Sequence, residues 1–195
     1  MILYHGTALH RLDSILKSGL LPRGRGRKGN WDGCARSHDG YTYLSSWMPV
    51  YYAANAMQGN EDRAVILKVE VDEVDLYPDE DFVFQNLSHA LGKPLEDLQQ
   101  RVKLDRYKKV AKASLAHYGS VATRFVLPGK ILAHHVLSPG LRIWGALGGD
   151  IVPALMTYRI LGKQYERRLE ILFEQGEEAA QADEDNFYAT FKSLP

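Results

Sequence analysis

The chain has 195 residues, and its 24 lysines and arginines are balanced by 24 aspartates and glutamates. A neutral chain of this length with 45% apolar residues is typical of a globular protein and excludes a histone-like binder of nucleic acid. Its one cysteine excludes a disulfide scaffold and a multi-cysteine zinc site, and no apolar run reaches the roughly 18 residues of a membrane span. We therefore expect a soluble, cytoplasmic protein of a reducing compartment.

Apolar spacing predicts strands and helices that are interspersed along the chain. A strand over 1–5 leads into a helix over 8–18, which Gly19 should end and Pro22 cannot continue. The same pattern predicts strands at 41–45, 64–71, 121–127 and 131–137, and helices at 49–57, 85–118 (broken at 92–94) and 151–174. We interpret Pro128-Gly129 as the turn of a hairpin between the last two strands. Antiparallel pairing of this kind indicates an α+β fold rather than a doubly wound α/β fold.

Charge is unevenly distributed along the chain. Residues 22–40 combine five glycines with five basic residues, which predicts a mobile loop. The end of the chain is acidic, so we expect one domain over 1–175 and an acidic tail over 176–195, mobile unless its aromatic side chains dock. A face for nucleic acid, or simply a solvated basic face, could be formed by Arg23, Arg25, Arg27, Lys108, Lys109 and Lys112. The sequence does not indicate an oligomeric state.

Standard catalytic motifs are absent, and no histidine spacing is typical of a metal site, so no metal is expected. A set of residues in the first sixty positions remains. His5, at a strand end, stands next to Gly6, where the main chain can approach a ligand closely. Tyr43 on a strand and Tyr52 on the next helix can enclose a flat ring. Such a set suits the recognition of nicotinamide, and the alternative is that these residues only pack the core.

Several short segments, in this order, resemble the ADP-ribosyltransferase superfamily. They are Tyr4-His5-Gly6-Thr7, Ile15-Leu16-x-x-Gly19-Leu20, Tyr43-Leu44-Ser45, Tyr52-Ala53 and the later stretch 121–131. The branch that they resemble most has a His-Tyr pocket for NAD and includes poly(ADP-ribose) polymerases, diphtheria-type toxins and tRNA 2′-phosphotransferases. The resemblance covers about residues 1–137. It implies split antiparallel β-sheets with flanking helices and a C-terminal helix.

The resemblance also implies roles for individual residues, with NAD as substrate. In the family, the histidine binds the nicotinamide ribose, the main chain of the next residue pairs with the carboxamide, and the tyrosines stack on the ring. Tyr51 points elsewhere, because it is the next residue on the same helix as Tyr52. By position, the cofactor-binding residues would be His5, Gly6, Thr7, Tyr43, Ser45 and Tyr52, and the catalytic residues His5, Tyr43 and Arg124.

The sequence departs from the family at one point. Polymerases and toxins of this type carry a glutamate at the start of a late strand, a position that falls near 120–122 here. Residues 106–149 contain no aspartate or glutamate at all. We therefore expect no carboxylate beside His5 and Tyr43, unless another segment supplies one, for example through Glu70. Arg124 could instead hold a phosphate.

These observations favour an enzyme that transfers single ADP-ribose units from NAD to a protein or nucleic acid, or that hydrolyses NAD. Departure of nicotinamide with little help from a nucleophile tolerates a missing general base, because positioning and electrostatics do most of the work. Two alternatives stay open. One is a binding or interaction module without catalysis, and the other is an RNA 2′-phosphotransferase.

Overall fold

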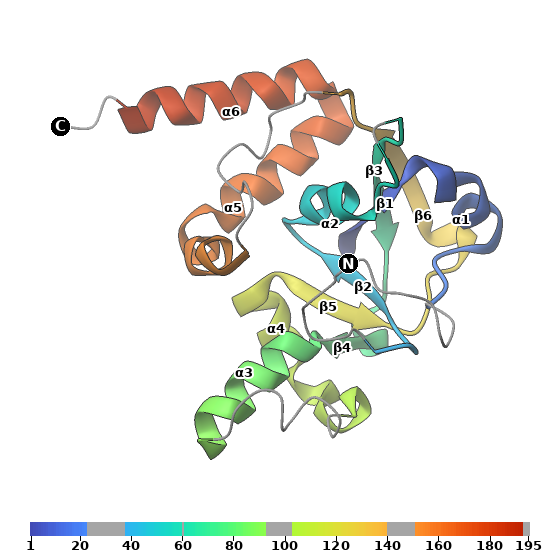
Figure 1. Cartoon of the computed structure of the whole chain (residues 1–195), viewed down its shortest axis with the longest axis vertical. Coiled ribbons are helices and arrows are strands. Elements are labelled where there is room, and N and C mark those ends of the chain that lie inside the picture. The colour runs from blue at the N-terminus through green and yellow to red at the C-terminus, as the bar shows by residue number, and fades with distance from the viewer. Residues whose placement is uncertain (23–37, 60, 93–102, 140–150, 193–195) are drawn as a thin grey trace.

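The computed structural model describes residues 1–22, 38–59, 61–92, 103–139 and 151–192. Within them the chain has an α+β fold with six antiparallel strands in the order β4-β5-β2-β1-β3-β6 (Figure 1). The strands are β1 (Ile2–Ala8), β2 (Thr42–Ser45), β3 (Ala64–Glu70), β4 (Leu76–Pro78), β5 (Ser120–Thr123) and β6 (Ile131–Val136). The α-helices are α1 (Leu12–Ser18), α2 (Pro49–Ala56), α3 (Glu80–Leu91), α4 (Ala111–Tyr118), α5 (Ile151–Gln175) and α6 (Glu177–Lys192). Short 3-10 helices are η1 (Leu9–Arg11), η2 (Glu73–Asp75), η4 (Leu104–Val110) and η5 (Pro128–Lys130).

The sheet consists of two well-paired groups of strands that meet at one point. Strand β1 pairs with β3 at every residue from Ile2 to Ala8, and β2 pairs with β5 at all of its residues. Between β1 and β2, by contrast, the structure has one partner pair, Tyr4 with Ser45. The groups β4-β5-β2 and β1-β3-β6 therefore open away from each other on both sides of this pair.

Both faces of the sheet are buried. One face carries Leu3 and Leu67 and packs against Leu12 of α1. The other carries Tyr4 and Ile66 and packs against residues that precede α2 or belong to α5 and α6, among them Trp47, Met48, Tyr165, Leu169, Leu172 and Ala180. Because side chains alternate between the two faces of a strand, cover on both sides explains the continuous apolar centre of β3.

The predicted hairpin at Pro128-Gly129 is wrong. Strand β5 pairs with β2 and β4, whereas β6 pairs with β3 at the opposite edge of the sheet. The chain between β5 and β6 crosses the sheet, and an isolated antiparallel bridge between Leu20 and Val126 joins it to the segment after α1. The prediction of antiparallel pairing is confirmed, but through other partners.

The first helix ends as predicted, although its start differs. A 3-10 turn over η1 precedes α1, so the helix begins at Leu12. Gly19 ends it with a φ of 82°, and a Cβ there would come within 2.2 Å of the Val126 carbonyl oxygen. Only glycine fits this position, because the backbone conformation and the close approach both exclude a side chain.

The region before β5 contains elements that the apolar pattern missed. Strand β4 is short, and the helix predicted from residue 85 begins at Glu80, where the Asp79 side chain accepts a hydrogen bond from the Asp81 N–H. Asp79 is thus a conventional N-cap, whose short acidic side chain satisfies a free amide of the first turn. This earlier start brings three consecutive acids to the centre of the fold.

The C-terminal segment is a helix and not a tail without structure. The helix α5 agrees with the prediction, and α6 follows it and packs against it. Arg168 of α5, 1% exposed, lies between Asp183, at 3.1 Å, and Glu184. The acidic character of this segment therefore serves a buried ion-pair network. No helix in the described ranges is both long and apolar enough to cross a membrane.

Candidate functional site

The edge of β1 that faces β2 is open at Gly6. Hydrogen bonds flank the β1–β3 ladder at both ends. At one end Met1 and Val71 exchange two backbone hydrogen bonds, of 2.7 and 3.0 Å, and at the other the Leu9 N–H donates to the Arg63 carbonyl. In an antiparallel pair such bonded positions alternate with non-bonded ones. Odd-numbered residues of β1 therefore bond to β3, and the N–H and C=O of Ile2, Tyr4 and Gly6 point toward β2. Tyr4 meets Ser45, but no described strand residue is paired with Gly6 on that side.

His5 bridges the opening at this point. Its Nδ1 lies 2.9 Å from the Tyr43 carbonyl oxygen on β2. Since a carbonyl can only accept, Nδ1 carries the hydrogen. Burial lowers the pKa of His5, an effect partly offset by this hydrogen bond. The neutral imidazole thus keeps Nε2 as a hydrogen-bond acceptor.

Gly6 has a packing role that differs from the one expected. A Cβ at Gly6 would lie 1.9 Å from the Pro49 carbonyl oxygen and 2.5 Å from the Ala53 nitrogen. The missing side chain therefore lets α2 pack directly on β1 and is not itself the opening for a ligand. What Gly6 offers at the opening is its main chain, which points sideways toward β2.

The two predicted tyrosines are both anchored at the start of α3. The His38 N–H donates to the Tyr43 hydroxyl at 3.1 Å, and this hydroxyl donates to Glu80. The Tyr52 hydroxyl lies beside Ser120, whose own hydroxyl donates to Asp79 at 2.7 Å. Residues far apart in the sequence are thus brought to one place by their hydroxyl groups.

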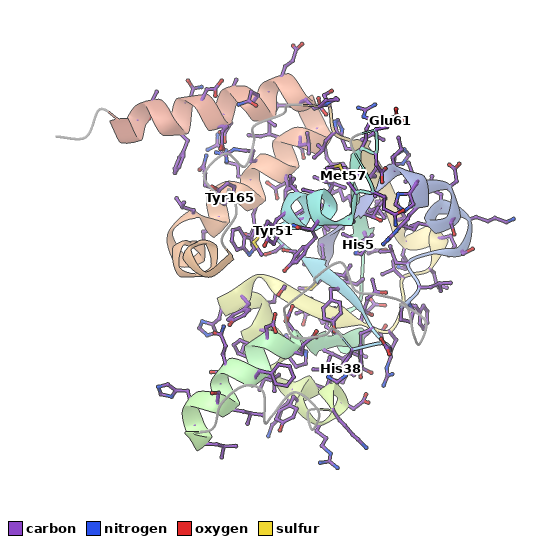
Figure 2. All side chains as sticks on the ribbon, in the orientation of Figure 1. His5, His38, Tyr51, Met57, Glu61 and Tyr165 are labelled. Atoms are coloured by element: carbon purple, nitrogen blue, oxygen red, sulfur yellow. The ribbon has the colours of Figure 1, made fainter. Side chains whose placement is uncertain are left out.

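Tyr51 and Tyr52 are neighbours on α2, and both are partly buried against the cluster that contains Tyr165 of α5. Figure 2 shows Tyr51 on the side of α2 that faces Tyr165. The ring of Tyr51 meets that of Tyr52 edge to face, with centroids 5.9 Å apart. The expectation that only Tyr52 faces the pocket stays a prediction.

A carboxylate from another segment does lie beside Tyr43, although none of the described acids contacts His5. Glu80 accepts the Tyr43 hydroxyl, while the carbonyl of the same tyrosine holds His5. Ser120, within the positions where the family carries its glutamate, instead holds the Asp79 carboxylate. The acids come from the turn before α3. Glu70, the alternative named from the sequence, is paired with Lys130 at 2.6 Å.

Asp79 is built into the scaffold by three hydrogen bonds, and a fourth bond between its neighbours extends the network. Its carboxylate accepts from Ser120 and from the Asp81 N–H, its own N–H donates to the Ser114 hydroxyl, and that hydroxyl donates to the Ser120 carbonyl. Such a network ties α3, α4 and β5 together. Asp79 is 8% exposed, so we assign it a supporting role.

Burial dominates the electrostatics of this turn. It raises the pKa of Glu80 well above its usual range, and the charge of Asp79 adds to the effect. Burial, followed by the charge of Asp79, also raises the pKa of Asp81 to about 7. For Tyr43 and Tyr52, burial and the neighbouring acids raise the pKa in the same direction. The cluster therefore favours protonated, neutral side chains.

Three buried polar atoms near these residues have no hydrogen-bond partner in the described chain: Glu80 Oε2, the Thr42 hydroxyl and the Tyr118 hydroxyl. Buried polar groups are normally satisfied, so each of them is available to a ligand or a water molecule. The sequence analysis missed all three residues. Only Glu80 had a sequence signal, because Pro78-Asp79-Glu80-Asp81 before an apolar run is typical of a helix start.

Other predicted site residues lie outside this constellation. The Ser45 hydroxyl donates to the Gly119 carbonyl and accepts from the Trp47 and Met48 N–H groups, so it shapes the entry to α2. Arg124 makes two contacts of 2.9 Å with Asp105 and lies over the Tyr41 ring. These contacts give Ser45 and Arg124 structural roles in place of the predicted ribose and phosphate contacts.

The remaining predicted residues fall into two groups. Thr7 is 2% exposed and shares a face of β1 with His5. Lys108 lies over Tyr77, Lys112 pairs with Glu73 at 2.5 Å, and Lys109 is exposed. Arg23, Arg25 and Arg27 lie outside the described residues. The basic face can thus be traced only along η4 and the start of α4.

Taken together, the opening offers an imidazole acceptor and a main-chain donor and acceptor. The hydroxyl groups of Tyr43 and Tyr52 lie beside Glu80 and Ser120. In the described ranges, no three histidine, cysteine, aspartate or glutamate side chains are grouped to hold a metal ion. No protein-family model matches the sequence, and no curated protein matches it significantly. The geometry and the sequence resemblance therefore carry the functional argument.

Proposed function

We propose that the protein is an NAD-dependent mono-ADP-ribosyltransferase whose nicotinamide pocket is the opening between β1 and β2. The observation that carries the proposal is that, among the described strand residues, none pairs with the main chain of Gly6 on the β2 side, next to His5. A primary carboxamide presents one C=O and one N–H side by side, as a strand residue does. The carboxamide of NAD can therefore take the place of the missing strand partner, accepting from the Gly6 N–H and donating to its C=O.

The neighbouring groups suit the rest of the nicotinamide riboside. Nε2 of His5 accepts a hydrogen bond from a ribose hydroxyl, because Nδ1 holds the proton on the Tyr43 side. The rings of Tyr43 and Tyr52 enclose the pyridinium, which is cationic in NAD and is attracted to aromatic faces. Since the Tyr43 hydroxyl is engaged by Glu80 and the His38 N–H, Tyr43 acts through its ring.

In the proposed reaction, the bond between the nicotinamide nitrogen and C1′ of the ribose breaks. Nicotinamide leaves as a neutral molecule with the bonding electron pair, and the ribose becomes an oxocarbenium-like cation. A nucleophile of the acceptor then bonds to C1′ and loses its proton to water. Glu80 supports Tyr43, and because burial raises its pKa, its protonated form is favoured, which cannot accept a proton from a second ribose hydroxyl. The proposal is therefore transfer of single ADP-ribose units to a protein or nucleic acid.

The test is incubation of the protein with NAD carrying a labelled adenylate, with nicotinamide release and label transfer measured separately. Release with label on a macromolecule supports transfer, and release without it supports NAD hydrolysis. Binding without release would leave a binding module, and no binding would overturn the proposal. An RNA 2′-phosphotransferase would instead remove a phosphate from RNA in the presence of NAD.

His5→Ala gives the site-specific arm of this test. We expect it to abolish nicotinamide release and to weaken NAD binding at least about tenfold, while the protein stays folded. His134→Ala is the matched control, because His134 is an exposed histidine of β6, opposite Leu67 and thus on the other side of β3 from β1. Unchanged NAD binding in folded His5→Ala protein would refute the assignment of the pocket.

A further inference from the structure

A second opening lies on the other side of the Tyr4–Ser45 pair. It is a groove of about 470 Å³, lined by Ile2, Leu3 and Tyr4 of β1, by Leu115 and Ala116 of α4, and by one side of α5. In Figure 1, α5 and α4 both lie to the left of the point marked N, one above it and one below. The groove is thus distinct from the opening at Gly6, although the same strand borders both.

The main chain of Ile2 faces this groove. By the alternation set by Met1 and Val71, the N–H and C=O of Ile2 point away from β3, as those of Gly6 do. Ile2 has no partner on β2, since the chain leaves the sheet after Ser45. With about 3.3 Å per residue, Ile2 and Gly6 are roughly 13 Å apart along the strand. A strand edge with free donors and acceptors is a template for pairing with another chain.

Three carboxylates line the groove from α5. Glu166, Glu170 and Glu174 follow one another at every fourth residue, so they lie on one side of the helix about 6 Å apart along its axis. None of the three makes an ion pair within the described residues. Like charges at this spacing destabilise a helix. Their arrangement therefore favours a cationic occupant.

The lysines of the groove are engaged elsewhere. Lys112 pairs with Glu73, and Lys68 lies over the Phe173 ring with its nitrogen 5.7 Å from the centroid. Four glutamates, two lysines and the Met1 ammonium group line the groove, which leaves a balance of one negative charge. Neither lysine neutralises the row on α5 in the manner of a salt bridge.

Tyr4 places a hydroxyl group in the groove beside the acidic row. It is 5% exposed and lines the groove, yet no described residue forms a hydrogen bond with its hydroxyl. Burial and the charges of Glu170, Glu166 and Glu174 raise its pKa to about 12. The polar end of a buried side chain thus lies within the field of the acidic row. Such a hydroxyl can accept a hydrogen bond from a ligand cation.

We propose that this groove binds an extended peptide segment of a partner protein in which lysine or arginine occupies alternate positions. Its main chain pairs with Ile2, and its basic side chains reach Glu166, Glu170 and Glu174. The spacing of the basic side chains matches that of the glutamates: alternate side chains of a strand are about 6.6 Å apart, and the glutamates are about 6 Å apart along the helix. A polyamine could use the carboxylates but would leave the Ile2 main chain unpaired. This inference does not depend on the proposed reaction.

The test uses the whole protein and a fluorescent peptide of alternating lysine and valine, with binding followed by anisotropy. The variant Glu166→Gln/Glu170→Gln/Glu174→Gln should bind about tenfold more weakly or worse, because close charge pairs are lost. The matched control is Asp13→Asn/Glu61→Gln/Glu178→Gln, which removes the same charge at exposed positions elsewhere. It should bind as the parent does. Equal losses in both variants, or no binding to the parent, would overturn the proposal.

A second measurement separates a peptide from a polyamine. Hydrogen exchange of the Ile2 amide should slow at least about tenfold when the peptide is bound, and it should not slow with spermidine. A peptide of alternating serine and valine should bind more weakly than the lysine peptide. If spermidine binds as tightly as the lysine peptide and Ile2 exchange does not change with either, the occupant is a polyamine and the peptide proposal fails.

Discussion

The two edges of β1 are built from the same residues but differ in almost every physical respect. Along the β3 edge, pairing is continuous from Ile2 to Ala8, and the aliphatic side chains of the facing strand are fully buried. Along the β2 edge there is one pair, and the groups beside it are an imidazole, tyrosines and acids. The continuous edge holds the fold together, whereas the open edge leaves main-chain groups free. Both candidate sites lie where the pairing between β1 and β2 ends and main-chain groups of β1 have no strand partner among the described residues.

Gly6→Ala should have the largest effect, because it disturbs both edges at once. The new Cβ would meet the Pro49 carbonyl and the Ala53 amide, so α2 must move away from β1. We expect a loss of stability of about 3 kcal/mol or more, together with loss of NAD binding. Urea unfolding measures the loss of stability. Gly129→Ala is the control, since no atom lies within 4 Å of a Cβ at Gly129. A parent-like midpoint for Gly6→Ala would contradict the packing of α2 described above.

Replacement of the two neighbouring tyrosines tests which one belongs to the open edge. Tyr52→Ala should weaken NAD binding by about 1–3 kcal/mol through lost stacking, whereas Tyr52→Phe should cost much less. Tyr51→Ala is the control on the side of α2 that faces α5, and it should lower the melting temperature while binding changes little. Calorimetric titration with NAD distinguishes them. The reverse ranking would show that the stacking residue was misassigned.

The acids at the start of α3 predict a pH-dependent stability. The pKa of Glu80 is raised in the folded state, so the folded protein holds a proton that the unfolded chain releases above about pH 4.3. The stability that Glu80 contributes is therefore complete below that value and is lost as the pH rises through the folded-state pKa. Glu80→Gln keeps an acceptor for Tyr43 but cannot ionise. Its melting temperature relative to the parent should rise steadily between about pH 5 and pH 8.

Glu61→Gln is the matched control for this measurement, at an exposed position that Figure 2, compared with Figure 1, places away from α3. The difference in melting temperature between Glu61→Gln and the parent should not rise between about pH 5 and pH 8. If the difference between Glu80→Gln and the parent is independent of pH, the acid is not buried as described, and its support of Tyr43 needs another explanation.

Arg124→Ala should have the smallest effect. The side chain is 48% exposed, and its contacts with Asp105 and Tyr41 are those of a partly exposed ion pair and a cation–π pair. We expect a loss of about 1 kcal/mol in stability and an NAD affinity equal to that of the parent. Thermal melting and NAD titration measure the two quantities. A tenfold loss of NAD affinity would return Arg124 to the pocket and extend the site beyond the open edge.

Local signals in the sequence predicted much of the fold. The strand at β3 and the helices α2 and α5 agree with the predictions to within a few residues, because apolar spacing and an N-terminal proline act over short distances. The three-residue strand β4 was missed, since it has no room for a periodic pattern. The sequence predicts an acidic tail at α6, because the end of the chain is rich in aspartate and glutamate. In the structure, Glu184 is 2% exposed and pairs with Arg168.

The sequence by itself determined the candidates His5, Gly6, Tyr43 and Tyr52, since their residue types and order were sufficient to single them out. Only the tertiary structure decided how they are used. It paired β5 with β2 instead of β6, brought Asp79 and Glu80 to the tyrosines, and gave Ser45 and Arg124 hydrogen-bond partners within the scaffold. The physical reason is that a buried carboxylate is held by hydrogen bonds from residues close to it in space, and these residues need not be close in the sequence. Hydrogen bonds from Ser120 and Tyr43 hold acids that lie some forty residues from either of them in the chain.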